Sequence, residues 1–288
     1  HFYMLADTHR VKNFVKAIRQ KVHVGSTVID LGAGTGILGI ECAKAGADTV
    51  HMVEQEPKLI PVIEAMIKEH GVEEQCVIHN KRSDDFFKEY DGPKPDLMVC
   101  EGIGDHIFES RIIYDFLKAK QQLGGIDTIP GVFKLNLHSH TVRLNREPLE
   151  GYHTVLDKLN VPKLDSVNII DNVILDPMFK WGDKIGETKT LLNFGVLKDL
   201  KTNKLILEFD RTLDDDEYLV LYFDITLGQK LNISNSPSRE AEPHSYYQRL
   251  VSCKGIHRKK AKLIIDYEKH IPGIEDQPYP NLEIVNVL

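Results

Sequence analysis

The segment 27–39 constrains the fold more than any other part of the chain, because a short apolar strand leads through three alternate glycines into a helix. The glycines are Gly32, Gly34 and Gly36, and Asp30 lies just ahead of them. Glycine lets the backbone turn sharply and approach a ligand closely, and the first turn of the next helix presents unpaired N–H groups. The segment therefore predicts a cofactor-binding loop at the carboxyl end of a strand.

A second apolar strand, at 49–53, ends in Glu54, where a carboxylate can accept both hydroxyls of a ribose. The spacing G-x-G-x-G differs from the dinucleotide pattern G-x-G-x-x-G. It resembles the nucleoside site of S-adenosylmethionine-dependent methyltransferases, and we expect that cofactor. A nicotinamide or flavin nucleotide, and a tight strand–helix turn without a ligand, are the alternatives.

Composition narrows the class of protein. The 288 residues include 36 Lys and Arg against 43 Asp and Glu, and this mildly acidic balance argues against a nucleic-acid surface covering the molecule. The four cysteines are far apart and form no C-x-x-C pair, so we predict neither a metal site nor a disulfide framework. No apolar run is long enough to span a membrane. We therefore expect a cytoplasmic protein that has reduced thiols and no membrane partner.

Helices and short apolar strands alternate through residues 4–127, which is typical of a doubly wound parallel sheet. The expected helices are 7–21, 36–45, 57–69, 83–89 and 109–120, and the expected strands are 26–31, 48–53, 75–79 and 95–100. Ligands of such sheets bind at the carboxyl ends of the strands, where the glycine loop, Glu54 and Glu101 all fall.

The pattern changes close to Pro130. Short strand-like segments separated by polar turns predict an antiparallel sandwich or barrel, and they lie at 134–140, 205–209, 218–223 and 262–267. The segment 158–184 interrupts their spacing and carries eight large apolar residues between positions 167 and 179, so we interpret it as an inserted arm that needs a covering surface. The acidic run 214–217 is interpreted as a solvated hairpin tip. We expect two domains, 1–129 and 130–288.

This organisation resembles the protein arginine methyltransferases along essentially the whole chain. Residues 4–10 are similar to the family's M-L-x-D-x-x-R helix, and the resemblance implies that Arg10 pairs with the cofactor carboxylate. Residues 30–36 match the cofactor loop, Glu54 matches the ribose carboxylate, and 123–130 matches the junction into the barrel. The resemblance implies a Rossmann-like methyltransferase domain, an antiparallel β-barrel with an inserted dimerisation arm, and S-adenosylmethionine as cofactor.

The catalytic elements of the family match less well. Two glutamates of the family hold the substrate guanidinium, and they correspond to Glu101 and Glu109, but the loop between them is one residue short and Gly102 replaces an aromatic residue. In the family's T-H-W loop, Ser245 stands where the histidine is expected. Because a displacement of about 1 Å can lower a rate on the order of 100-fold, we expect Glu101 and Glu109 to be non-productive.

Three hypotheses follow. The first is a catalytically impaired regulatory subunit, resembling the trypanosomatid prozyme subunits, that activates an active arginine methyltransferase. It would bind that partner through the arm as a heterodimer or heterotetramer, with RNA-binding proteins as a substrate class, and would bind S-adenosylmethionine weakly alone. The second is an active, divergent arginine methyltransferase. The third is a binding module without a cofactor.

Overall fold

The computed structural model describes residues 7–103, 115, 119, 121–131, 134–144, 158, 179–184, 192–193, 202–209, 211–215, 217–234, 249–266 and 281–286. The chain forms two compact units. The first comprises His1–Lys134, Asp224–Ser234 and Ala241–Ser245, and the second comprises Leu135–Phe223, Asn235–Glu240 and Tyr246–Leu288. In the part of the chain described, no helix combines the length and the apolar character needed to cross a membrane.

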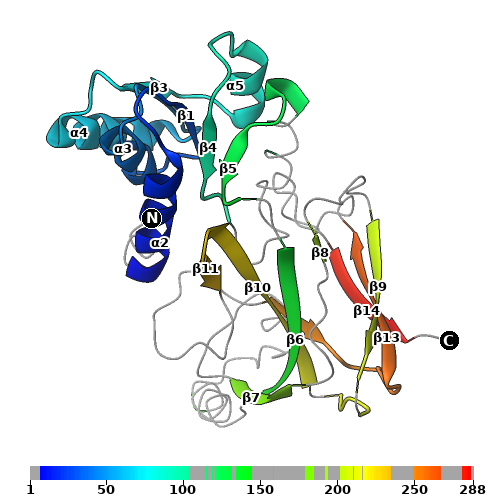
Figure 1. Ribbon diagram of the computed structural model, residues 1–288. Coiled ribbons are helices and arrows are strands. Elements are labelled where there is room, and N and C mark those ends of the chain that lie inside the picture. The colour runs from blue at the N-terminus through cyan, green and yellow to red at the C-terminus, as the bar shows by residue number, and fades with distance from the viewer. Residues whose placement is uncertain are drawn as a thin grey trace. The chain divides into compact units, whose positions relative to one another are not determined.

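The first unit contains a parallel sheet of five strands in the order β3-β2-β1-β4-β5 (Figure 1). The strands are β1 (Thr27–Leu31), β2 (Thr49–Val53), β3 (Cys76–His79), β4 (Leu97–Cys100) and β5 (Asp127–Ile129). All four residues of β4 and four of the five of β1 are buried, as expected for central strands covered on both faces. The predicted doubly wound parallel sheet is confirmed.

Helices lie on both faces of this sheet, with α3 and α4 on one side and α5 on the other (Figure 1). The helices are α2 (Thr8–Lys21), α3 (Ile37–Lys44), α4 (Ile60–His70), which follows the 3₁₀ turn η1 (Pro57–Leu59), and α5 (Ser83–Glu89). Neighbouring residues of β2 face opposite layers, because Met52 lies against α3 while the ring of His51 contacts Phe86 of α5. The winding direction reverses between β1 and β4, and this reversal places a crevice at their carboxyl ends.

The remaining strands are antiparallel. One sheet has the order β11-β10-β6-β7, with β12 on β10 and β8 on β6, and a second has the order β14-β13-β9. Their bounds are β6 (Lys134–Leu144), β7 (Phe179–Lys184), β8 (Leu192–Asn193), β9 (Thr202–Glu208), β10 (Glu217–Gly228), β11 (Leu231–Ser234), β12 (Arg249–Ser252), β13 (Lys260–Asp266) and β14 (Asn281–Asn286).

Each of the four strand-like segments predicted after Pro130 falls on one of these strands, namely β6, β9, β10 and β13. Closure into a barrel stays a prediction. Of the predicted arm, only Lys158 and β7 fall within the described residues, and of the predicted helix 109–120 only residues 115 and 119 do.

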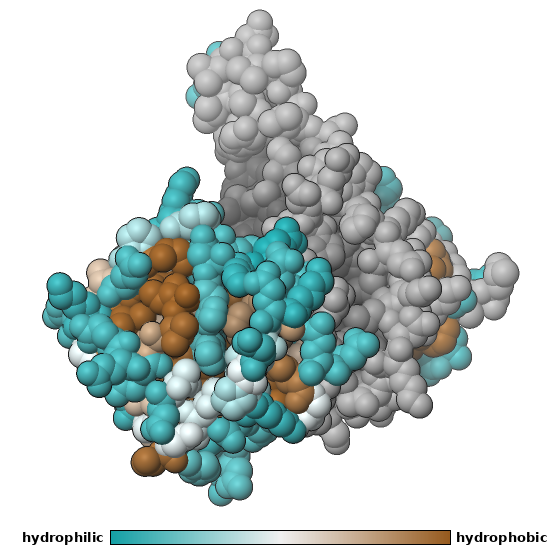
Figure 2. Space-filling view, turned by 90° about the horizontal axis from the view of Figure 1, so that it is seen from above, coloured by the Kyte–Doolittle hydropathy of each residue, from teal (hydrophilic) through white to brown (hydrophobic). Residues whose placement is uncertain are grey.

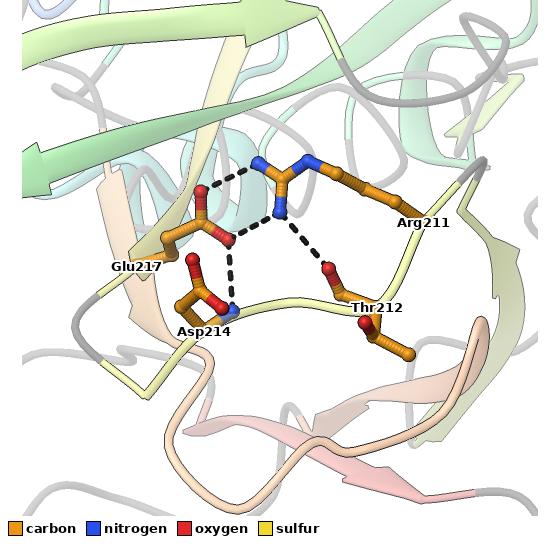
Figure 3. Close-up of polar contacts among 4 residues, drawn as sticks. All are labelled: Arg211, Thr212, Asp214 and Glu217. Atoms are coloured by element: carbon orange, nitrogen blue, oxygen red, sulfur yellow. Dashed lines mark hydrogen bonds and ion pairs between the residues drawn. The ribbon is translucent and has the colours of Figure 1, made fainter.

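The acidic run 214–217 differs from its prediction. Asp214 and Asp215 are exposed, but Glu217 is only 1% exposed and accepts a two-pronged hydrogen bond from Arg211 (Figure 3). Arg211 Nη2 lies 2.5 Å from Glu217 Oε1, and Nη1 lies 2.8 Å from Oε2, which also accepts the Asp214 N–H. The interpretation of the whole run as a solvated tip is therefore wrong at Glu217, because an arginine six residues earlier compensates its buried charge.

Candidate cofactor site

The glycine loop follows β1 directly and is fixed by backbone hydrogen bonds. Gly32, Gly34 and Gly36 have φ angles of 74°, 58° and 84°, a left-handed conformation that a side chain disfavours. The N–H groups of Gly32 and Ala33 both donate to the carbonyl of Val53, at 2.9 and 3.0 Å. The loop is thus tied to the end of β2, and its tight turns are possible because glycine occupies them.

Glu54, the residue after β2, braces the same loop. Its Oε2 accepts the Gly34 N–H at 2.8 Å, and its Oε1 accepts the Glu56 N–H at 2.8 Å. The residue is 7% exposed. A carboxylate offers about four acceptor positions. Glu54 therefore retains the capacity to accept ribose hydroxyls while it holds the loop.

Asp30 lies within β1, beneath the loop, and is 1% exposed. Its Oδ2 accepts the Gly39 N–H at 2.8 Å, which fastens the first turn of α3 to the strand. Burial raises the pKa of Asp30 to about 7; the negative charges of Glu54 and Glu101 act in the same direction, and the Gly39 N–H opposes them. At neutral pH this carboxyl is thus close to the midpoint of its titration.

Arg10 of α2 meets Glu101, the first residue after β4. Arg10 Nη1 lies 2.5 Å from Glu101 Oε1, and the two side chains are 5% and 14% exposed. The helix begins at the cap residue Asp7, whose Oδ1 accepts the Arg10 N–H at 3.0 Å. Two predicted site residues that are 91 positions apart therefore form one charge-assisted hydrogen bond.

A cavity of about 210 Å³ lies between α2 and the loop. Helix α2 contributes Arg10, Val11 and Phe14, the loop contributes residues 32–35, and Glu101 and Gly102 line it as well. It thus combines one cationic group, one anionic group and apolar walls beside glycine backbone. This chemistry fits the zwitterionic amino-acid end of S-adenosylmethionine. The cavity is smaller than the roughly 300–1,000 Å³ of typical ligand pockets, so it suits only part of such a molecule.

The predicted site residues fall into two groups. Arg10, Gly32, Gly34 and Glu101 line the cavity, whereas Asp30, Gly36 and Glu54 support the loop from behind. Their contact with a cofactor stays a prediction, and Glu109 and Ser245 lie outside the described residues. The sequence reasoning missed Val11 and Phe14, although their spacing from the buried Ile18 marks an apolar stripe of the helix.

Comparisons of sequence relate this chain to named arginine methyltransferases. Residues 7–99 match the family model described as Conserved hypothetical protein 95. The arginine N(omega)-methyltransferase of Streptomyces achromogenes is 25% identical over 86% of this chain and 68% of its own length. Protein arginine N-methyltransferase 1 of Oryza sativa subsp. indica is 24% identical over 84% of this chain and 64% of its own length. The chain thus spans about two thirds of the length of these curated relatives.

Comparisons of structure agree on the fold. The crystal structure of PRMT6 superposes with a TM-score of 0.66, at 15% identity, over 99% of this chain and 98% of the other. The Trypanosoma brucei PRMT1 enzyme–prozyme heterotetrameric complex with AdoHcy gives 0.65, at 19% identity, over 92% and 86%. The homologues of this chain are thus arginine methyltransferases, its structural neighbours are protein arginine methyltransferases, and it has the fold that they share.

Proposed function

We propose that this chain is a catalytically impaired arginine methyltransferase paralogue that acts as a regulatory, prozyme-like subunit of an active arginine methyltransferase. In this proposal residues 1–129 are the cofactor domain, residues 130–288 are a barrel, and the arm at 158–184 binds the partner. The assembly is a cytoplasmic heterodimer or heterotetramer, with RNA-binding proteins as a substrate class.

The observation that carries the proposal is the ion pair between Arg10 and Glu101. A glutamate that binds a substrate guanidinium must direct its charge at the substrate, but Glu101 directs an oxygen at Arg10, 2.5 Å away. An incoming guanidinium would compete with an arginine already buried in place. The short loop after Gly102 and the serine at 245 support the same conclusion.

Cofactor binding is part of the proposal. Arg10 would hold the carboxylate of S-adenosylmethionine, Glu54 would accept the ribose hydroxyls, and the loop 32–36 would lie against the ligand. The cofactor supplies an electrophilic methyl group on its sulfonium. Since Arg10 is already paired with Glu101, binding must rearrange this pair, and we expect weak affinity in the isolated chain.

The partner role rests on apolar surface. Between positions 167 and 179 the arm carries eight large apolar residues, and burying each contributes roughly 1.5–3 kcal/mol before the cost of association. Figure 2 shows a patch of apolar residues framed by hydrophilic ones on one face of the described chain. On α4 of the first unit, Val62 is 40% exposed. A neighbouring structure, the trypanosome complex, is itself an enzyme–prozyme heterotetramer.

The test combines activity with assembly. The chain is assayed with labelled methyl donor and an arginine-rich, glycine-rich peptide, alone and mixed with an active arginine methyltransferase, and gel filtration follows complex formation. We expect no turnover alone and a raised rate in the mixture. Replacing Ile170, Ile174 and Phe179 with Asp should separate the subunits and abolish the increase. If the triple variant still co-elutes and sustains the full rate, the arm is not the interface.

An active, divergent enzyme is the second candidate. Sequence similarity to named arginine methyltransferases over most of the chain favours it, as does a glycine loop that hydrogen bonds fix to Val53 and Glu54. Free arginine belongs among the substrates assayed, because the Streptomyces relative is named for arginine rather than for protein arginine. Robust turnover by the lone chain that Glu101→Gln removes would establish this alternative and exclude the regulatory one.

A further inference from the structure

The helix α2 supplies part of the cavity wall, so its position determines where the Arg10 guanidinium points. Arg10, Val11 and Phe14 all lie on this one helix, within about one turn. Arg10 is 4% exposed, and its charged end depends on a partner from another element of the unit. A small rotation of α2 about its axis would therefore move the guanidinium away from the loop.

A hairpin from the distant residues 224–234 holds this helix. The end of β10 and the strand β11 belong to the first unit, and α2 packs against β11. Between Thr226 and Gly228 the pairing register shifts, and Gly228 approaches the helix so closely that an added Cβ would lie 3.0 Å from Gln20 Oε1. Ala17 Cβ of the helix would lie 3.8 Å from the same added atom, so the hairpin and the helix are close neighbours at this point.

One polar contact made by a buried asparagine fixes the register of helix and hairpin. Asn13 is 7% exposed, and its Nδ2 donates to the carbonyl of Asn232 at 3.0 Å and lies 2.8 Å from His9 Nε2. The side chain of Asn232 in turn accepts from Thr226 Oγ1 at 2.9 Å, which fixes the residue that receives the helix. Apolar contacts allow one element to slide along another, whereas a hydrogen bond from a buried side chain is satisfied only within a narrow range of distance and angle.

We propose that Asn13 is a positioning residue of the cofactor site: by donating to Asn232 it sets the rotation of α2 and thereby aims Arg10 at the cavity. Asn13 is three residues after Arg10 and is not among the residues that line the cavity. Its effect on ligand binding is therefore indirect. The inference rests on the proposed cofactor function only for the choice of ligand.

The test compares the full chain with Asn13→Ala and with Asn13→Asp, which keeps the shape but removes the donor. In the ligand-free chain, hydrogen exchange should accelerate about fivefold to tenfold at the amides of α2 and remain unchanged at α3 and β1. Titration with S-adenosylhomocysteine by ligand-observed NMR should show about fivefold to tenfold weaker binding for both variants. Lys16→Ala, on the exposed face of the same helix, is the matched control.

Ile67→Val, in the buried face of α4, is the control for a general loss of stability. It weakens packing elsewhere in the unit and should leave the affinity for the ligand unchanged. The inference is overturned if α2 exchange is unaltered in the Asn13 variants, or if Ile67→Val weakens binding as much as they do. If the unaltered chain binds no S-adenosylhomocysteine at millimolar concentration, the cofactor proposal fails, and hydrogen exchange alone still decides the role of Asn13.

Discussion

Replacing Asp30 with Asn should stabilise the chain at alkaline pH, although the aspartate lies in the predicted cofactor motif. The pKa of Asp30 rises from 3.8 to about 7 on folding, chiefly through burial. Between these two pH values the folded chain holds the proton more tightly than the unfolded chain, so stability falls as the pH rises through this range. The full penalty applies above pH 7 and vanishes below pH 3.8.

The magnitude follows from the same values. At about 1.4 kcal/mol for each pH unit between 3.8 and 7, keeping Asp30 ionised in the folded chain costs up to about 4 kcal/mol. Asparagine is never charged and keeps an oxygen for the Gly39 N–H, so Asp30→Asn removes this penalty. We expect the variant to exceed the free energy of unfolding of the unaltered chain by about 1–2 kcal/mol at pH 5 and by about 4 kcal/mol at pH 8.5.

Urea unfolding followed by circular dichroism, from pH 5 to 8.5, measures the difference. Asp30→Ala removes the acceptor for Gly39 as well as the charge, so it should be less stable than Asp30→Asn at every pH. The exposed Asp96 also accepts a backbone N–H, from Thr27 at 2.8 Å, and its replacement by Asn should not stabilise the chain. A stability difference between Asp30→Asn and the unaltered chain that is constant from pH 5 to 8.5 would refute the burial argument.

Three further predictions concern stability. Gly39→Ala should lower the free energy of unfolding by about 1–3 kcal/mol in urea titrations, because the added methyl group would lie 2.7 Å from a methionine side chain behind the loop. Arg211→Ala should lower it by about 2–3 kcal/mol, because the buried Glu217 carboxylate loses both hydrogen bonds from the guanidinium. If the double variant Arg211→Ala with Glu217→Gln is destabilised equally, the unpaired carboxylate is not the cause. Burial lowers the pKa of His51 and His79, so the neutral histidines contribute fully to the free energy of unfolding above pH 6.5, and this contribution falls at lower pH as the unfolded chain takes up protons. The melting temperature of His51→Phe should therefore decrease less between pH 7.5 and 5 than that of the unaltered chain.

The sequence was sufficient for four strands of the parallel sheet, β1 to β4, because each is an apolar run followed by a recognisable turn or helix, whereas the three-residue β5 was missed. The loop at Gly32–Gly36 was also predictable from the sequence, because its three alternate glycines have the positive φ angles that favour glycine. In the antiparallel part, β11 and β12 were missed because four residues with polar members carry little periodic signal.

The sequence did not predict which charged side chains contact one another in the folded chain. The resemblance assigned Arg10 to a cofactor carboxylate, but nothing in the local pattern indicates that Glu101 lies 2.5 Å from it. The burial of Glu217 was missed for a related reason, because an acidic run normally indicates solvent, and the compensating Arg211 lies outside the run. Periodicity predicts which face of an element is buried, and it does not predict which buried charges meet.

The buried thiols make this chain convenient for labelling. Cys42, Cys100 and Cys253 are buried, and burial raises the pKa of the half-buried Cys76 to about 11 and that of Cys253 to about 12. Maleimides react with thiolates, which these side chains scarcely form at neutral pH. A single cysteine introduced at the exposed Glu69 of α4 should therefore take up one fluorophore without removal of the native four. The distance between two such dyes, one on each subunit, would then report assembly of the proposed heteromer in solution.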